Sequence, residues 1–340
     1  MACLVAFAAH GQAPNPQNQP PPEKEKQLKP AIPEPRVNIE PRTKRSATAD
    51  EDRLDQRRAN IRVDTTLVLI PVNVTDPLNR FVKDLDKEHF RIFEDNVEQE
   101  IKQFSSEDAP LSVGIVFDTS GSMGSKLAIS RQAVAQFLKL ANPEDEFFLV
   151  TFNDRPRLVQ PFTSSTEEIQ NKLSFVGSKG STALLDGLYL AMATMKKARN
   201  PRKAILVISD GGDNSSRYTQ TEVQNAVREA DVQIYAVGIF EEGVYSGGGR
   251  SPEEMGGPGL MTKLAHETGG RHFALGNVAE LPDVAEKIGI ELRNQYVIGY
   301  TPKNTAWDGK YRRVRVTVAP IRNAPKMRAY YRLGYYAPLR

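Results

Sequence analysis

From Leu111 onward the chain alternates short apolar runs with segments of helical periodicity, and this alternation is the feature that most limits the fold. Because helical segments separate the predicted strands, the strands are expected to run parallel. The sequence therefore predicts a doubly wound, mostly parallel α/β sheet, Rossmann-like, with helices on both faces. The strands are expected at 112–118, 146–153, 157–162, 203–209, 233–239 and 271–275, and the helices near 125–141, 166–176, 183–199, 219–231, 260–268 and 279–294.

The segments on either side of this region alternate apolar and polar residues with a period of two, which is typical of half-buried strands. Val68, Ile70, Val72 and Val74 share one face of such a strand. Neither segment is long enough to form a stable domain of its own. We therefore expect residues 63–108 and 295–338 to pair into one small β-sandwich, interrupted by an α/β domain at 109–294. Further strands of this sandwich are predicted at 90–93, 98–104, 296–300, 311–318 and 326–333.

The first 62 residues differ in composition from the rest. Residues 14–62 are rich in proline, glutamine, lysine and glutamate, which predicts a disordered linker. Residues 1–13 are uncharged and mostly small or apolar, and Gly11-Gln12-Ala13 suits signal-peptidase cleavage, so we interpret them as a signal-peptide remnant. This interpretation predicts a secreted or envelope-associated protein. No later segment has the ~20 continuous apolar residues that a transmembrane helix needs.

Charge and cysteine content exclude some classes of function. The formal net charge is +3, and residues 14–62 supply all of it with 11 basic and 8 acidic residues. The predicted folded part is therefore neutral, which argues against nucleic acid as a partner. Cys3 is the single cysteine, so neither a disulfide framework nor a cysteine zinc site is available.

Polar side chains follow or precede predicted elements at three places. Asp118-Thr119-Ser120-Gly121-Ser122 follows a buried strand, Thr182 lies in a turn before a helix, and Asp210 ends another strand. The carboxyl ends of parallel strands lie along one edge of the sheet. The loops that follow them come together at the point on this edge where the strand order reverses. Hydroxyl and carboxylate oxygens are ligands that Mg²⁺ prefers. The sequence predicts a magnesium site at Asp118, Ser120, Ser122, Thr182 and Asp210, although each residue also has an ordinary interpretation as a turn or cap residue.

Residues 111–293 resemble the von Willebrand factor type A domain, because Asp118, Ser120, Ser122, Thr182 and Asp210 match its metal-ion-dependent adhesion site (MIDAS). The resemblance implies that the three hydroxyls touch the ion and that the aspartates often act through water. It also implies that Asp186 and Asp213 are acidic neighbours of the site, which would lie around the ion without touching it. Together with the flanking segments, residues 63–338 are similar to a bacterial group of von Willebrand A-related proteins, catalogued largely from acidobacteria.

The resemblance favours a non-enzymatic binding or cell-adhesion module, in which Mg²⁺, with Mn²⁺ as the alternative, bridges to an acidic residue of a protein partner. Two alternatives remain open: a metal-dependent hydrolase, and a structural surface module without a metal-bridged ligand. No Gly-x-Ser-x-Gly elbow or phosphate-binding loop is present in the sequence, which argues against the first. The glycine-rich stretch 241–259 is predicted to be a loop near the metal face, either a specificity loop or a passive insertion.

Overall fold

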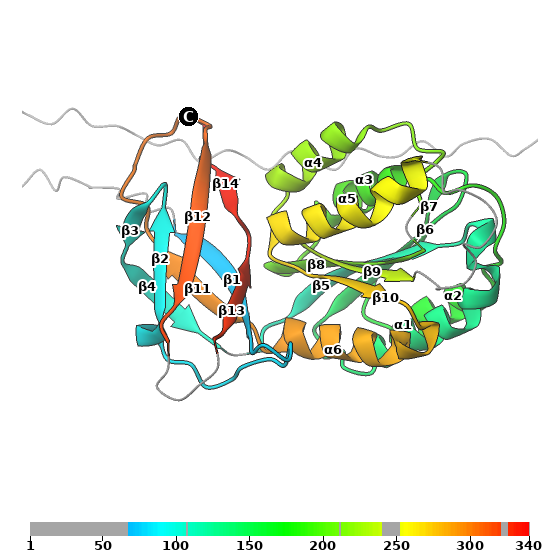
Figure 1. The fold of residues 1–340 in the computed structure, drawn as a ribbon, viewed down its shortest axis with the longest axis horizontal. Coiled ribbons are helices and arrows are strands. Elements are labelled where there is room, and N and C mark those ends of the chain that lie inside the picture. The colour runs from blue at the N-terminus through cyan, green and yellow to red at the C-terminus, as the bar shows by residue number, and fades with distance from the viewer. Residues whose placement is uncertain (1–66, 107, 211, 240–251, 321–325, 340) are drawn as a thin grey trace, which may run out of the picture. The chain divides into compact units, whose positions relative to one another are not determined.

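The computed structural model describes residues 67–106, 108–210, 212–239, 252–320 and 326–339. The predicted signal segment, the linker and most of the glycine-rich stretch lie outside the described residues. The described part contains one six-stranded sheet with helices on both faces and two four-stranded antiparallel sheets (Figure 1). This confirms the predicted fold class, while the domain boundaries remain predictions. Among the described residues, no helix is both long and apolar enough to cross a membrane.

The six-stranded sheet has the order β10-β9-β8-β5-β6-β7. Its neighbouring strands are parallel except for β7, which joins β6 in antiparallel fashion. After β5 the chain adds strands on one side, and from β8 onward it adds them on the other. The strand order therefore reverses between β5 and β8. The strands are β5 (Leu111–Asp118), β6 (Glu146–Phe152), β7 (Pro156–Thr163), β8 (Arg202–Ser209), β9 (Gln233–Ile239) and β10 (His272–Leu275).

The six α-helices in the described part of the chain form two layers, one on each face of this sheet (Figure 1). Every residue of β5 and β6 is buried, because both faces of these strands are covered. One layer contains α1 (Leu127–Leu138), α2 (Thr166–Ser174) and α6 (Leu281–Arg293). The other contains α3 (Leu184–Met195), α4 (Gln220–Glu229) and α5 (Pro252–Thr268).

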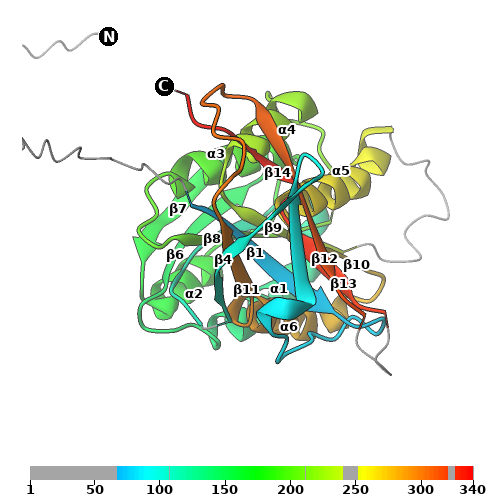
Figure 2. The same ribbon diagram turned by 90° about the vertical axis from the view of Figure 1, so that its left-hand side faces the viewer.

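The two antiparallel sheets combine strands from both ends of the described chain (Figure 2). One sheet has the order β13-β1-β11-β4 and the other β14-β12-β2-β3. The predicted shared face of the first strand is correct, because Val68, Ile70, Val72 and Val74 are all buried. The strands are β1 (Val68–Thr75), β2 (Phe90–Glu94), β3 (Val97–Gln99), β4 (Ile101–Ser105), β11 (Tyr296–Tyr300), β12 (Tyr311–Val318), β13 (Arg328–Tyr331) and β14 (Gly334–Tyr336).

Two predicted strands are each split in the structure. The segment predicted as 98–104 contains the end of β3 and most of β4, and the segment predicted as 326–333 contains β13 and ends just before β14. In both cases the chain changes sheets: β3 pairs with β2 and β4 with β11, whereas β13 pairs with β1 and β14 with β12. The alternation of apolar residues does not reveal which sheet a residue joins.

The predicted loop 241–259 was partly wrong. Helix α5 begins at Pro252, eight residues earlier than the predicted helix 260–268, so residues 252–259 belong to a helix. Residues 240–251 lie outside the described residues. The start of the first helix differs as well: residues Gly121–Lys126 form a 3₁₀ helix, and α1 begins only at Leu127.

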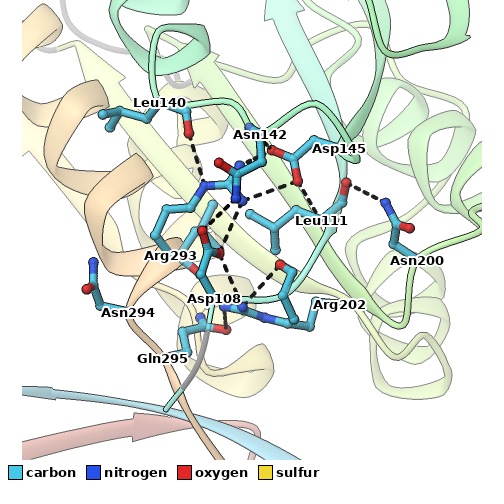
Figure 3. Close-up of polar contacts among 12 residues, drawn as sticks. Asp108, Leu111, Leu140, Asn142, Asp145, Asn200, Arg202, Arg293, Asn294 and Gln295 are labelled. Carbon is cyan, nitrogen blue, oxygen red and sulfur yellow. Dashed lines mark hydrogen bonds and ion pairs between the residues drawn. The ribbon is translucent and has the colours of Figure 1, made fainter.

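The chain enters and leaves the α/β region through one polar cluster at the amino ends of β5 and β8 (Figure 3). The buried carboxylate of Asp145 accepts a hydrogen bond from the Leu111 N–H at 2.8 Å and forms an ion pair with Arg293. Arg293 also contacts Asp108, with 3.3 Å between Nη1 and Oδ1. The segments before β5 and after α6 are therefore held together at the edge of the sheet opposite the predicted metal site.

Candidate metal site

The loop after β5 is organised around the carboxylate of Asp118. The last residue of the strand, Asp118 is fully buried. Its Oδ1 accepts a hydrogen bond from the Ser120 N–H at 2.8 Å, and its Oδ2 accepts one from the Ser209 hydroxyl at 2.6 Å. Ser209 ends β8, so this carboxylate links the two strands between which the strand order reverses.

The two serines of the motif lie side by side. The turn that follows Asp118 brings the Ser120 and Ser122 hydroxyl oxygens within 3.0 Å of each other. Ser120 is buried and directly precedes the 3₁₀ helix, whereas Ser122 is exposed within it. The alternate spacing of the serines thus places two neutral hydroxyl oxygens at one point on the carboxyl edge of the sheet.

The segment that carries Thr182 is fixed to this loop by its backbone. The Gly121 N–H donates to the Gly180 carbonyl at 2.9 Å, and the Lys179 N–H donates to the Thr119 carbonyl at 2.9 Å. Thr182 itself is buried, and its N–H donates to Asn214 Oδ1 at 2.9 Å. Only Ser181 separates Thr182 from Gly180, so the threonine lies at the same edge as the serines.

Gly180 is needed for this approach. Its φ of +79° falls in the left-handed region that glycine favours. A Cβ atom there would also lie 2.5 Å from the carboxylate of Asp154. That carboxylate accepts the Ser181 N–H at 2.7 Å and thereby holds the turn before α3.

Asp210 follows β8 and lies close enough to Asp118 for their charges to interact. Burial, and after it the negative charge of Asp210, together raise the pKa of the Asp118 carboxyl to about 6. Two carboxylates are thus held near each other at a largely buried edge. A cation bound between them would relieve this cost, which is the main electrostatic reason that the donor set suits a metal.

Sequence reasoning missed Lys126, which is the ion-pair partner of Asp210. Its amine lies 3.2 Å from Asp210 Oδ2, and the two side chains are 11% and 10% exposed. The residues are 84 positions apart in the chain, so the pairing has no local sequence signature. The one available signal is a lysine directly before a helix, where a positive charge is electrostatically unfavourable.

The two acidic neighbours of the site, Asp186 and Asp213, hold a loop in place. Asp186 Oδ1 accepts the backbone N–H groups of Arg217 and Tyr218 at 2.8 and 3.1 Å. Asp213 Oδ2 accepts the Leu185 N–H at 3.3 Å, and burial raises the pKa of its carboxyl. These bonds anchor residues 213–218 against the start of α3, beside the segment that carries Thr182.

The donor set fits a hard divalent cation through its hydroxyls rather than through many carboxylates. Among the described residues, no group of three or more His, Cys, Asp or Glu side chains could hold a metal ion. The predicted set contains only two carboxylates, and three hydroxyls would have to complete it. Such oxygen ligands suit Mg²⁺ or Mn²⁺ rather than a softer metal.

The fold and the edge at which these loops gather define a doubly wound α/β domain with an oxygen-rich loop cluster at its switch point. Residues 113–212 match the family model of the von Willebrand factor type A domain. The chain therefore contains a von Willebrand factor type A domain, as the motif had indicated.

Curated relatives share only part of their length with this chain. An uncharacterised protein of Borreliella burgdorferi is 25% identical over 188 residues, which are 49% of this chain and 54% of the relative. Inter-alpha-trypsin inhibitor heavy chain 4 of Mus musculus is 30% identical over 146 residues, which are 38% of this chain and 16% of the relative. The magnesium-chelatase 67 kDa subunit of Chlorobaculum tepidum is 27% identical over 188 residues, which are 52% of this chain and 30% of the relative. The chain thus spans about half the length of the first relative and far less of the other two.

A solved structure of a von Willebrand factor type A protein from Catenulispora acidiphila has a similar fold over a larger part of the chain. The alignment covers 79% of this chain and 74% of the Catenulispora acidiphila chain, with a TM-score of 0.46 and 13% sequence identity.

Proposed function

We propose that this protein is a non-enzymatic, metal-dependent binding module that captures a protein partner through an acidic residue. Asp118, Ser120, Ser122, Thr182 and Asp210 would hold the ion, Mg²⁺ or alternatively Mn²⁺. The bound ion would supply a positive charge with an open coordination position toward solvent. The convergence of Ser120 and Ser122, 3.0 Å apart, with the buried Asp118 carboxylate is the observation that carries the proposal.

The chain's own residues prepare the site for this role. The Ser120 N–H and the Ser209 hydroxyl orient the Asp118 carboxylate. Because neutral hydroxyls supply three of the five ligands, much of the charge of the ion would remain uncompensated. A carboxylate from a partner would then be attracted to the open position.

The ion site is tested by calorimetric titration of Mg²⁺ and Mn²⁺ into the folded protein. We expect one saturable site, and Ser120→Ala should weaken binding at least tenfold because it removes one ligand. Ser174→Ala, an exposed serine on α2, is the matched control and should bind the ion like the wild type. Absence of saturable uptake in the wild type would rule out the ion site.

The partner is tested separately, by capture of envelope or matrix proteins on the immobilised protein with Mg²⁺ and with chelator. We expect capture that chelator and Ser120→Ala both abolish. Capture that survives both treatments would exclude the metal bridge. Ion binding without any metal-dependent capture would instead favour a structural module. Capture should be tried with both surface and intracellular extracts. Residues 1–13 predict an extracytoplasmic location, whereas one relative is a magnesium-chelatase subunit.

A further inference from the structure

The ion pair between Lys126 and Asp210 places a cation of the protein itself at the proposed metal site. The Lys126 amine and Asp210 Oδ2 are 3.2 Å apart, and both side chains are about nine-tenths buried. An ion pair between a lysine and an aspartate on the exposed surface contributes little to stability, because water competes for both charges. A pair withdrawn from water is different, since removing one partner leaves the other charge buried without compensation.

Lys126 also lies at an electrostatically unfavourable position. It is the last residue of the 3₁₀ helix and the cap residue of α1, where the helix N–H groups create a partial positive charge. A lysine at this point is repelled by the helix end. Asp210 is the acidic partner that offsets this repulsion, so the pairing stabilises both the start of α1 and the loop after β8.

Asp210 is also one of the two carboxylates of the proposed metal set, and its charge disfavours ionisation of Asp118. An ammonium group and a divalent ion cannot both neutralise the same carboxylate oxygen at close range without repelling each other. Binding of the ion must therefore disrupt or lengthen the contact between Lys126 and Asp210, and the free energy of that contact is subtracted from the free energy of ion binding.

We propose that Lys126 is an internal competitor for the metal site. It holds Asp210 when no ion is bound, which keeps the loops assembled, and it lowers the affinity for the divalent ion. This proposal rests on the proposed function, because it assumes that Asp210 belongs to the ion site.

The test compares wild type, Lys126→Met and Lys126→Arg by calorimetric titration with Mn²⁺ and with Mg²⁺. Methionine keeps the length of the side chain and removes its charge, so we expect about tenfold tighter ion binding. Arginine retains the charge and should bind the ion about as the wild type does. Lys172→Met, an exposed position on α2, is the control for loss of a lysine elsewhere and should have no effect.

A second measurement covers the case in which the variant folds poorly without ion. In chelator we expect the thermal midpoint of Lys126→Met to lie below that of wild type, and saturating Mn²⁺ should raise it by more than it raises the wild type. In the background of Asp210→Asn the effect of Lys126→Met on the thermal midpoint in chelator should vanish, because the two charges form one interacting unit.

The outcomes separate this proposal from the proposed function. Equal or weaker ion binding by Lys126→Met, with normal binding by the wild type, would overturn the competitor role and leave the metal site intact. Saturable binding by both proteins, tighter in Lys126→Met than in the wild type, would support the competitor role. If neither protein takes up an ion, both proposals fail.

Discussion

Replacement of Asp118 by asparagine should remove a pH-dependent loss of stability from the ion-free protein. The two side chains have the same shape, and an asparagine can still accept the Ser120 N–H and donate to the Ser209 oxygen, so the loop should keep its geometry. The folded-state pKa of Asp118 is raised from 3.8 to about 6, first by burial and then by Asp210. At 1.36 kcal/mol per pKa unit, the difference corresponds to about 3 kcal/mol.

The sign follows from the protons bound in each state. Below about pH 4 the carboxyl is neutral in both the folded and the unfolded chain, and its ionisation costs nothing. Between about pH 4 and 6 the unfolded chain releases the proton while the folded chain retains it, so the free energy of unfolding falls as pH rises. Above about pH 6 the full loss of about 3 kcal/mol is present, and the asparagine variant does not suffer it.

Urea unfolding of both proteins in chelator, from pH 4 to pH 7.5, measures this effect. The difference in unfolding free energy between variant and wild type should grow by about 3 kcal/mol in favour of the variant across this range. Other titrating groups cancel in the difference, because they are common to both proteins. A difference that stays constant with pH would show that Asp118 titrates like an exposed carboxyl, and the electrostatic argument for a cation at this site would be lost.

Three further predictions concern other parts of the fold. Gly114→Ala should destabilise the protein by about 3 kcal/mol in urea unfolding, because its Cβ would lie 2.2 Å from the Phe148 ring, whereas Gly177→Ala, with open space around it, should cost almost nothing; equal effects would refute the packing argument. Glu94→Gln should cost about 2 kcal/mol, because the buried carboxylate accepts two tyrosine hydroxyls at 2.7 and 2.8 Å; an unchanged urea midpoint would contradict this. Phe175→Ala should leave the thermal midpoint unchanged, because the ring is 89% exposed; a lowered midpoint would assign the ring to packing instead.

Elements with strong periodicity could be predicted from sequence, and those that depend on distant partners could not. Strand β5 and the helix after it are marked by a continuous apolar run and a helical repeat, and their bounds were close to those observed. The split at Glu100 was missed because no glycine or proline marks the point at which the chain passes from one sheet to the other. The early start of α5 was missed because glycines outweighed the proline and glutamates at 252–254, which are typical of a first helical turn.

The candidate site shows the same division. The residue types and their positions at strand ends predicted which loops would gather, because parallel strands share one carboxyl edge. The closeness of the two serine hydroxyls follows from their alternate spacing in one turn. The pairing of Lys126 with Asp210 could not be predicted, because it depends on the packing of a 3₁₀ helix against a strand end 84 residues away.

The pairing of β4 with β11 gives the α/β domain an unusual place in the chain. Ser105 lies opposite Val297 in antiparallel register, so the two strands are neighbours of the kind that a short turn normally connects. Here the connection contains the six-stranded sheet and its helices, and Asp108 and Arg293 form an ion pair near its two ends. The six-stranded sheet and its helices thus stand where a hairpin loop would stand between two paired strands, and the register of that pair is fixed by contacts outside this sheet and its helices.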